Sequence, residues 1–308
     1  LLVILLYAFL IGVNALGSGF KLMGRDVLET FFRATSNPFI ALMVGLLATT
    51  LVQSSSVTTS LIVALVAAPE NPLPIANAVP MVMGANIGTT VTNTMVSLAH
   101  LTRRDEFRRA LAVATVHDFF NFFTVVALLP LELATGYLQI TAEWLASHVA
   151  GTGGVDYQSP VEVAVVAGAK PLLHLVGSLS GNRQLQAVLV VLASAFLIYF
   201  SLLLLVKNMR SLVRERMEAA ISGVLDRNAV LGMLVGLIVT VLVQSSSITT
   251  SLLVPLAGAG ILTLEQAFPV TIGANVGTTV TALLASLGAT GANAHHGVAI
   301  ALVHLLFN

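Results

Sequence analysis

Four stretches of this sequence contain no Asp, Glu, Lys or Arg, and each is long enough to cross a membrane. They run over residues 34–69, 71–102, 228–264 and 266–308. About 20 consecutive apolar residues in a helix span the hydrocarbon core of a bilayer. Only 9% of all residues are charged and 56% are hydrophobic, whereas roughly a quarter are charged in a soluble domain. The sequence therefore predicts an integral membrane protein.

Charge and cysteine content exclude several other classes. The formal net charge is zero and no cysteine is present, so we expect no nucleic-acid partner, no disulfide and no thiolate metal site. The chain starts at Leu1 without a methionine and stops at Asn308 within an apolar run. We therefore expect both natural termini to lie beyond it, with the last helix cut short.

The sequence is also duplicated. Three blocks return in the same order: 45–61 as 236–252, 80–92 as 269–281, and 114–121 as 301–308. The first block contains Gln-Ser-Ser-Ser, and the second contains Gly-Ala-Asn followed by Gly-Thr-Thr. Repetition of three blocks in one order indicates two copies of one structural unit.

Each copy predicts the same succession of elements. A long helix (1–20 and 184–206) is followed by a charged amphipathic stretch (21–36 and 207–227). Two apolar pieces then flank Gln-Ser-Ser-Ser, at 38–52 and 57–68 in the first copy. A run containing Gly-Ala-Asn comes next (74–101 and 264–288), and a last helix ends the unit (107–130 and from 295). At 1.5 Å per residue the two flanking pieces reach only ~22 and ~18 Å as helices, which favours a re-entrant hairpin with the serines at its tip. The run containing Gly-Ala-Asn is expected to be a helix broken within the membrane.

These elements predict an all-α integral membrane protein with two inverted-topology repeats, each with a re-entrant helical hairpin and a discontinuous transmembrane helix. Three net crossings per copy would give the copies opposite orientations, as in many secondary transporters. The expected domains are repeat 1 (1–130), an extracytoplasmic connecting segment (131–183) and repeat 2 (184–308). Nine of the 14 Lys and Arg residues fall on the side of 101–109 and 207–227, which places that side in the cytoplasm.

Both motifs carry polar groups suited to ions. A helix that starts after each motif would direct amide groups and its positive dipole end toward the break, where an anion can bind. Helices that end there would present carbonyls to a cation. Six serine hydroxyls lie beside the expected helix starts: Ser54, Ser55, Ser56, Ser245, Ser246 and Ser247. Neutral oxygen ligands come from Gln53, Gln244, Asn86, Asn275, Thr89, Thr90, Thr278 and Thr279.

The charge-free stretches supply no Lys or Arg for an anion and no Asp or Glu for a cation. Hydroxyls and amides alone would poorly offset the dehydration of a divalent anion. We therefore expect co-bound cations to balance the anion, so that each favours the binding of the other.

Structural explanations remain open for several of these residues. Serine, threonine and glycine also pack membrane helices together. His117 and His304 are equivalent positions, each four residues before an asparagine, and a helix-packing hydrogen bond or a direct role would explain them. Asp118 has no counterpart, because Leu305 follows His304; it is a functional candidate or a partner of the histidine. A serine nucleophile would need a base, none is apparent, and an enzyme is not expected.

With Gln53-Ser54-Ser55-Ser56 and Gln244-Ser245-Ser246-Ser247 in place, the chain resembles the type II sodium-dependent phosphate cotransporters of animals and bacteria. Residues 83–94, 107–121 and 128–132 are similar to that family too. The resemblance covers both copies and leaves out 135–183, where the absence of cysteine favours a bacterial inner-membrane member.

The resemblance implies sodium-coupled uptake of hydrogenphosphate by alternating access, without an organic cofactor. The expected partners are inorganic phosphate, Na⁺ and the lipid bilayer, with a homodimer as a candidate assembly. Phosphate is assigned to the six serines with Asn86 and Asn275; sodium is assigned to the two glutamines and four threonines, with Ser55 and Ser246 shared. A sodium-coupled carrier of another oxyanion or dicarboxylate and a passive anion channel remain alternatives.

Overall fold

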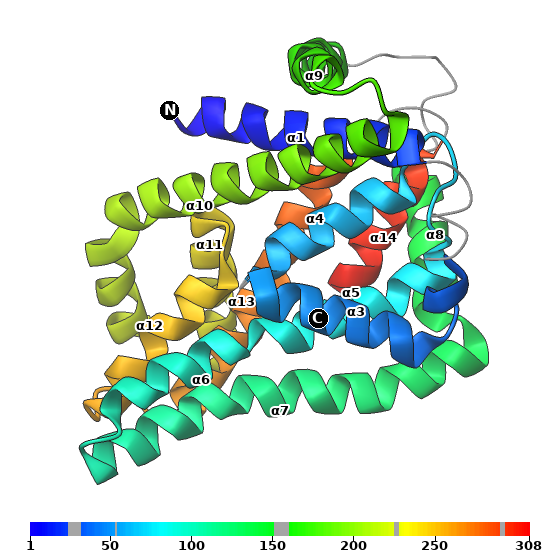
Figure 1. The fold of residues 1–308 in the computed structure, drawn as a ribbon. Helices are drawn as coiled ribbons and strands as arrows, with labels where there is room; N and C mark the ends of the chain where they lie inside the picture. The colour runs from blue at the N-terminus through cyan, green and yellow to red at the C-terminus, as the bar shows by residue number, and fades with distance from the viewer. Residues whose placement is uncertain (24–31, 53, 151–159, 225–227, 290–292) are drawn as a thin grey trace.

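The computed structural model describes residues 1–23, 32–52, 54–150, 160–224, 228–289 and 293–308, and this part of the chain contains helices and no strand (Figure 1). In chain order the helices are α1 (Leu2–Met23), α3 (Pro38–Val52), α4 (Ser55–Val66), α5 (Ile75–Thr89), α6 (Val91–Ser97), η1 (Leu98–His100), α7 (Arg104–Thr135), α8 (Tyr137–Ala150), α9 (Pro160–Ser178), α10 (Arg183–Val224), α11 (Ala229–Val243), α12 (Ser246–Gly258), α13 (Leu264–Ser286) and α14 (Ala294–Phe307). The prediction of an all-helical chain is confirmed.

Helix lengths follow the expected duplication with two differences. The pieces on either side of each serine motif are short, 15 and 12 residues for α3 and α4 and 15 and 13 for α11 and α12. α10 continues through the predicted amphipathic stretch to Val224, whereas residues 24–31 of the stretch 21–36 lie outside the described residues. The predicted connecting segment contains the end of α7 and two helices, α8 and α9.

The predicted break at the second Gly-Ala-Asn motif is wrong, because α13 runs without interruption from Leu264 to Ser286. In the first copy the interruption is limited to Thr90, which has nearly helical angles (φ −74°, ψ −22°) between α5 and α6. The helix therefore passes through both motifs, and its backbone amides there are used within the helix.

The glycines of this motif are needed for close helix packing. A Cβ on Gly84 would overlap the carbonyl of Leu42 in α3, and a Cβ on Gly273 would overlap the carbonyl of Met233 in α11. Glycine allows two helix backbones to come into contact at a crossing. The same crossing therefore occurs in each copy, between α3 and α5 and between α11 and α13.

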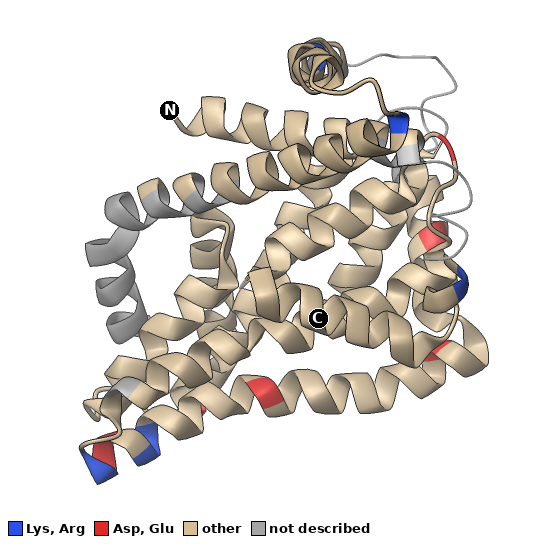
Figure 2. Cartoon of the chain, viewed as in Figure 1, with Lys and Arg blue, Asp and Glu red and all other residues tan. Residues whose placement is uncertain are grey.

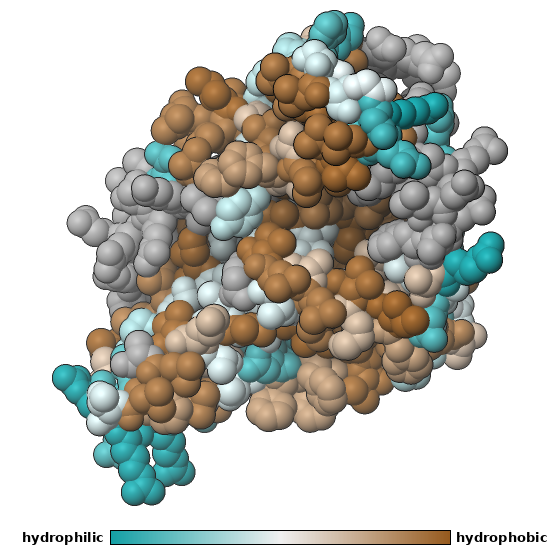
Figure 3. Space-filling view, in the orientation of Figure 1, coloured by the Kyte–Doolittle hydropathy of each residue, from teal (hydrophilic) through white to brown (hydrophobic). Residues whose placement is uncertain are grey.

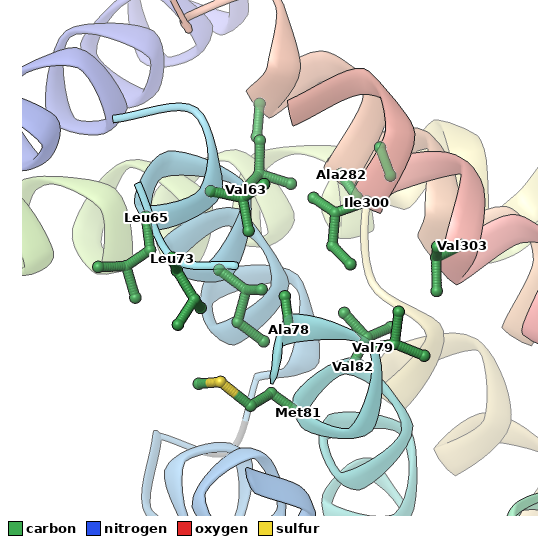
Figure 4. Close-up of a cluster of buried hydrophobic side chains, with 14 of the residues drawn as sticks. Val63, Leu65, Leu73, Ala78, Val79, Met81, Val82, Ala282, Ile300 and Val303 are labelled. Carbon is green, nitrogen blue, oxygen red and sulfur yellow. The ribbon is translucent and has the colours of Figure 1, made fainter. Parts of the chain in front are cut away.

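The two copies are also packed against each other. α1 lies along α10, its counterpart in the second copy, as Figure 1 shows. α4 contacts α13 and α14, and α12 contacts α6 and α7, so the second helix of each serine pair packs on helices of the other copy. In the core, Val63 and Val79 of the first copy lie near Ile300 and Val303 of the second (Figure 4).

Polar groups of the other copy hold the C-terminal ends of α4 and α12. Arg109 of α7 donates to the carbonyl of Gly258 at the end of α12, with Nη2 at 2.7 Å and Nε at 3.1 Å. Asn293, just before α14, donates from Nδ2 to the carbonyl of Ala68 just beyond α4, at 2.7 Å. Cationic and amide donors stabilise the unpaired carbonyls at a helix C-terminus.

The surface is that of a membrane protein. Three described helices are long and apolar enough to span a bilayer, within Arg104–Thr135, Arg183–Ser201 and Leu264–Ser286. In Figure 2 the charged residues of the described part lie mostly near helix ends and loops, with one acidic segment partway along α7. Brown apolar side chains cover much of the face seen in Figure 3. Because exposed apolar surface of this extent is unfavourable in water, the class of integral membrane protein is supported.

Candidate functional site

Each serine motif lies where a helix begins, as predicted. α4 begins at Ser55, and the side-chain oxygen of Ser54 accepts a hydrogen bond from the amide of Val57 at 3.3 Å. α12 begins at Ser246, and the oxygen of Ser245 accepts in the same way from Ile248 at 3.4 Å. Serine is a preferred N-cap residue because its oxygen pairs with an otherwise unpaired amide. The first serine of each motif therefore caps its helix.

The next two serines of each motif keep their hydroxyls available. Ser55, Ser56 and Ser246 are buried, and Ser247 is half-buried. Their hydroxyls form no hydrogen bond with another residue of the described part of the chain. The first amides of a helix have no partner within the helix. Hydroxyls and amides that can bind an anion thus gather at the start of α4 and again at the start of α12.

Gln244 forms the turn between α11 and α12. Its backbone is in the left-handed region (φ 58°, ψ 28°), which is uncommon for a residue other than glycine. Nε2 donates to the carbonyl of Val241 at 2.6 Å, and Oε1 accepts from the hydroxyl of Thr281 at 2.9 Å. The side chain therefore holds the turn against α13. Gln53, its counterpart, lies outside the described residues.

The two asparagines of the Gly-Ala-Asn motifs are bonded to the protein through both amide atoms. Oδ1 of Asn275 lies 2.6 Å from Nε2 of His117, and Nδ2 donates to Oδ1 of Asn121 at 2.7 Å. Oδ1 of Asn86 lies 3.3 Å from Nε2 of His304, and Nδ2 donates to the carbonyl of Val82 at 3.0 Å. In this conformation these amides position helices.

The histidine contacts are reciprocal between the copies. His117 belongs to the first copy and bonds the asparagine of the second, whereas His304 belongs to the second and bonds the asparagine of the first. Asn121 connects the asparagines of the two copies, because its Nδ2 donates to the carbonyl of Asn86 at 2.9 Å and its Oδ1 accepts from Asn275. The helix-packing interpretation of these histidines is therefore supported.

Two residues of this network were missed by the sequence analysis. Nδ2 of Asn93 lies 3.2 Å from Nδ1 of His117, and Oδ1 of Asn93 accepts from the hydroxyl of Thr250 at 3.0 Å. Thr250 lies one helical turn after Ser246, so the network reaches the second serine motif. Asn93 follows Asn86 by two turns on one helix face, and that spacing was the available signal.

Of the four threonines assigned to sodium, Thr278 and Thr279 lie inside α13, whereas Thr89 ends α5 and Thr90 lies between α5 and α6. Their hydroxyls donate to carbonyls three or four residues earlier in the chain, and the pattern is the same in both copies. The bonds run from Thr89 to Ala85 (3.0 Å), Thr90 to Ile87 (2.8 Å), Thr278 to Ala274 (3.1 Å) and Thr279 to Val276 (2.7 Å). Each hydroxyl oxygen retains lone pairs for a cation.

The structure thus joins Asn86, Asn275 and the second serine motif through one network. The described residues show no hydrogen bond from the first serine motif to it; α4 reaches the second copy by packing on α13 and α14. The arrangement consists of helix N-termini, hydroxyls and amides, duplicated within one chain, and the helices that flank the two serine motifs contain no charged residue. It has the features of an ion-coupled secondary transporter of the membrane.

Comparison with known proteins gives the family. The family profile described as Na⁺/Pi-cotransporter matches residues 8–142 and 196–308, which is more than half of the chain. The chain belongs to this family, which is one of transporters and not of enzymes.

Similar curated proteins come from animals. The sodium-dependent phosphate transport protein 2A of Rattus norvegicus is 34% identical over 371 residues, covering 98% of this chain and 58% of the rat protein. The sodium-dependent phosphate transport protein 2B of Homo sapiens is 31% identical over 394 residues, covering 98% of this chain and 56% of the human protein. The chain therefore spans less than two thirds of the relatives' length. No solved structure matches it significantly.

Proposed function

We propose that this protein is a secondary active transporter that takes up inorganic phosphate with sodium ions by alternating access. The observation that carries the proposal is the pair of helix starts at Ser55 and Ser246, where buried hydroxyls make no bond to the rest of the described chain. Helix N-termini favour phosphate and similar anions. The names of the relatives, sodium-dependent phosphate transport proteins, support phosphate and sodium as the cargo.

Sodium coupling follows from the lack of fixed charge. The helices that carry the two serine motifs contain no Lys, Arg, Asp or Glu. Dehydrating a divalent anion among neutral groups is unfavourable, and bound cations offset that cost. We assign phosphate to Ser54–Ser56, Ser245–Ser247 and the neighbourhood of Asn86 and Asn275. We assign sodium to Gln53, Gln244 and the four threonines, with Ser55 and Ser246 shared.

The assignment of the asparagines requires movement. Because His117 and Asn121 occupy both amide atoms of Asn275 in this conformation, a ligand would have to replace one of these bonds. We propose that the described state holds the asparagines with protein partners and that another state of the transport cycle releases them. Alternating access provides such a second state.

We also propose that the copies are inverted-topology repeats and that α3–α4 and α11–α12 are re-entrant hairpins. At 1.5 Å per residue, 12 to 15 residues reach only ~18–22 Å, less than the ~30 Å of the hydrocarbon core. The reciprocal bonds His117–Asn275 and His304–Asn86 are consistent with a two-fold relation. This proposal divides the chain into repeat 1 (1–130), an extracytoplasmic segment (131–183) and repeat 2 (184–308). It also places the protein in a bacterial inner membrane, as a homodimer.

The test is uptake by the purified protein in liposomes. Radiolabelled phosphate is supplied under an inward sodium gradient and, in parallel, under an equal potassium gradient. Accumulation that requires sodium and is inhibited by arsenate, but not by sulfate or succinate, is the expected result. Uptake that ignores the cation indicates a channel, and inhibition by sulfate, succinate or citrate indicates a carrier of another oxyanion or dicarboxylate; either contradicts the proposal.

A further inference from the structure

An apolar groove of ≈590 Å³ lies along α7, where that helix packs on α13. Its walls are aromatic. Phe119 and Phe123 of α7 are exposed and stacked on each other, with ring centres 6.1 Å apart. Phe120 and Phe268 are half-buried and meet edge to face between α7 and α13, with ring centres 5.9 Å apart. Because α7 belongs to the first copy and α13 to the second, a molecule that fills the groove contacts both copies.

The groove suits a hydrocarbon chain. Among the described residues that line it, Thr124 alone is polar, and its hydroxyl already donates to the carbonyl of Phe120 at 2.8 Å. A polar ligand would lose its hydrogen bonds to water here without replacing them. An acyl chain has no such bonds to lose, and the aromatic walls bury its apolar surface.

Two arginines at the start of α7 are available to a ligand. Arg104 and Arg108 are exposed and form no ion pair with the described part of the chain. Their neighbours are occupied, since Arg103 pairs with Glu106 at 2.9 Å and Arg109 holds the end of α12. Figure 2 shows the basic residues of α7 at this end of the helix and none farther along it.

The two arginines lie in line with the groove. Arg104 and Arg108 are four residues apart and share a helix face, and Phe119 follows Arg108 by three turns on that face. At 1.5 Å per residue, Phe119 and Phe123 lie ~16 and ~22 Å along the helix from Arg108. Half of a bilayer, headgroups included, is ~20 Å thick. A phospholipid whose phosphate lies beside Arg108 therefore places its acyl chain against these rings.

We propose that the groove binds an anionic phospholipid, with its phosphate between Arg104 and Arg108 and one acyl chain along Phe119 and Phe123. Arginine binds phosphate through charge-assisted hydrogen bonds. Asp105, exposed beside the two arginines, offsets one of their charges. The remaining positive charge favours a headgroup of net negative charge over a zwitterionic one. The site depends neither on sodium nor on the identity of the cargo.

The test uses a tryptophan in the groove and phospholipids with brominated chains, which quench tryptophan fluorescence on contact. The chain has one tryptophan, so Phe123→Trp in a Trp144→Phe background reports on the groove alone. The protein is reconstituted in bilayers that contain brominated phosphatidylglycerol or, in parallel, brominated phosphatidylcholine as the minor component. Phosphatidylglycerol is expected to bind about fivefold more strongly. That ratio corresponds to about 1 kcal/mol, the effect of one basic residue at an anionic membrane surface.

Charge variants in the reporter protein test the headgroup contact. Arg104→Gln combined with Arg108→Gln should abolish the preference for phosphatidylglycerol, and high salt should weaken it because exposed charges are screened. Arg183→Gln is the matched control and should keep the preference, since this exposed arginine lies at the start of α10. If the double variant fails to fold, Arg108→Gln alone should lower the preference at least twofold. A second reporter, Val126→Trp, is exposed on α7 outside the groove and should be quenched equally by both lipids.

Three results would overturn the proposal. The first is equal quenching of Phe123→Trp by the two lipids, and the second is a preference that survives in the folded charge variants. The third is a groove tryptophan that neither lipid quenches while Val126→Trp is quenched. That last result would indicate that protein, such as a second copy of the chain, covers the groove.

Discussion

Nε2 of His117 lies 2.6 Å from Oδ1 of Asn275, although the two residues are 158 positions apart in the sequence. His117 is fully buried, and its other ring nitrogen lies 3.2 Å from Nδ2 of Asn93. Since an amide nitrogen only donates and an amide oxygen only accepts, these contacts assign the ring as neutral, with the proton on Nε2. One imidazole therefore joins α6 of the first copy to α13 of the second.

Replacing His117 by alanine should destabilise the fold more than replacing His304. His117→Ala removes the partner of Oδ1 of Asn275 and of Nδ2 of Asn93, whereas His304→Ala removes only the partner of Oδ1 of Asn86. An unpaired buried polar group costs about 1–3 kcal/mol, so the expected losses are about 2–6 and about 1–3 kcal/mol before any cavity term. Thermal unfolding in detergent should show the larger decrease for His117→Ala. Equal decreases would argue against the network.

Removing the second serine of either motif should weaken phosphate binding. In Ser55→Ala or Ser246→Ala a buried hydroxyl at a helix start is lost, and the loss of one net bond of about 1.5 kcal/mol corresponds to roughly a tenfold rise in the half-saturating phosphate concentration. Sodium-driven uptake in liposomes measures it. Ser251→Ala is the control, because that hydroxyl donates to the carbonyl of Ile248 within α12. If neither serine change alters uptake by correctly inserted protein, the phosphate site lies elsewhere.

The turn at Gln244 should be destabilised by a β-branched residue and much less by asparagine. Its positive φ of 58° is acceptable to asparagine and strongly unfavourable for a β-branched residue. Gln244→Val should therefore lower the unfolding temperature more than Gln244→Asn. Thr281→Val tests the side-chain bond alone, since it removes the hydroxyl that donates to Gln244. Equal unfolding temperatures for the Val and Asn variants at 244 would contradict the backbone argument.

Glycine at the helix crossing should not accept a methyl group. Gly273→Ala places a Cβ against the carbonyl of Met233, and overpacking of this kind typically costs about 1–3 kcal/mol. Gly177→Ala is a matched control in α9, where nothing lies within 4 Å of the added atom; there alanine should be neutral or stabilise the helix by about 0.5–1 kcal/mol. Unfolding temperatures compare the two. A harmless Gly273→Ala would show that the helices do not cross as closely as described.

Much of the local structure could be predicted because it depends on neighbouring residues. Ser54 and Ser245 cap the helices that follow them, and N-capping is a local preference that a sequence reveals. The failure at residues 264–288 has an equally simple cause. Glycine occurs both where a helix breaks and where two helices touch, and the sequence around Gly273 does not show which neighbour will approach it.

The sequence by itself determined the membrane class, the duplication and the helix starts at the two serine motifs, because composition, repetition and capping need no knowledge of distant residues. Only the tertiary structure decided which groups Asn86 and Asn275 bind. The bonds His117–Asn275 and His304–Asn86 join residues 158 and 218 positions apart, and the direction of a side chain across such a separation is set by how the helices pack.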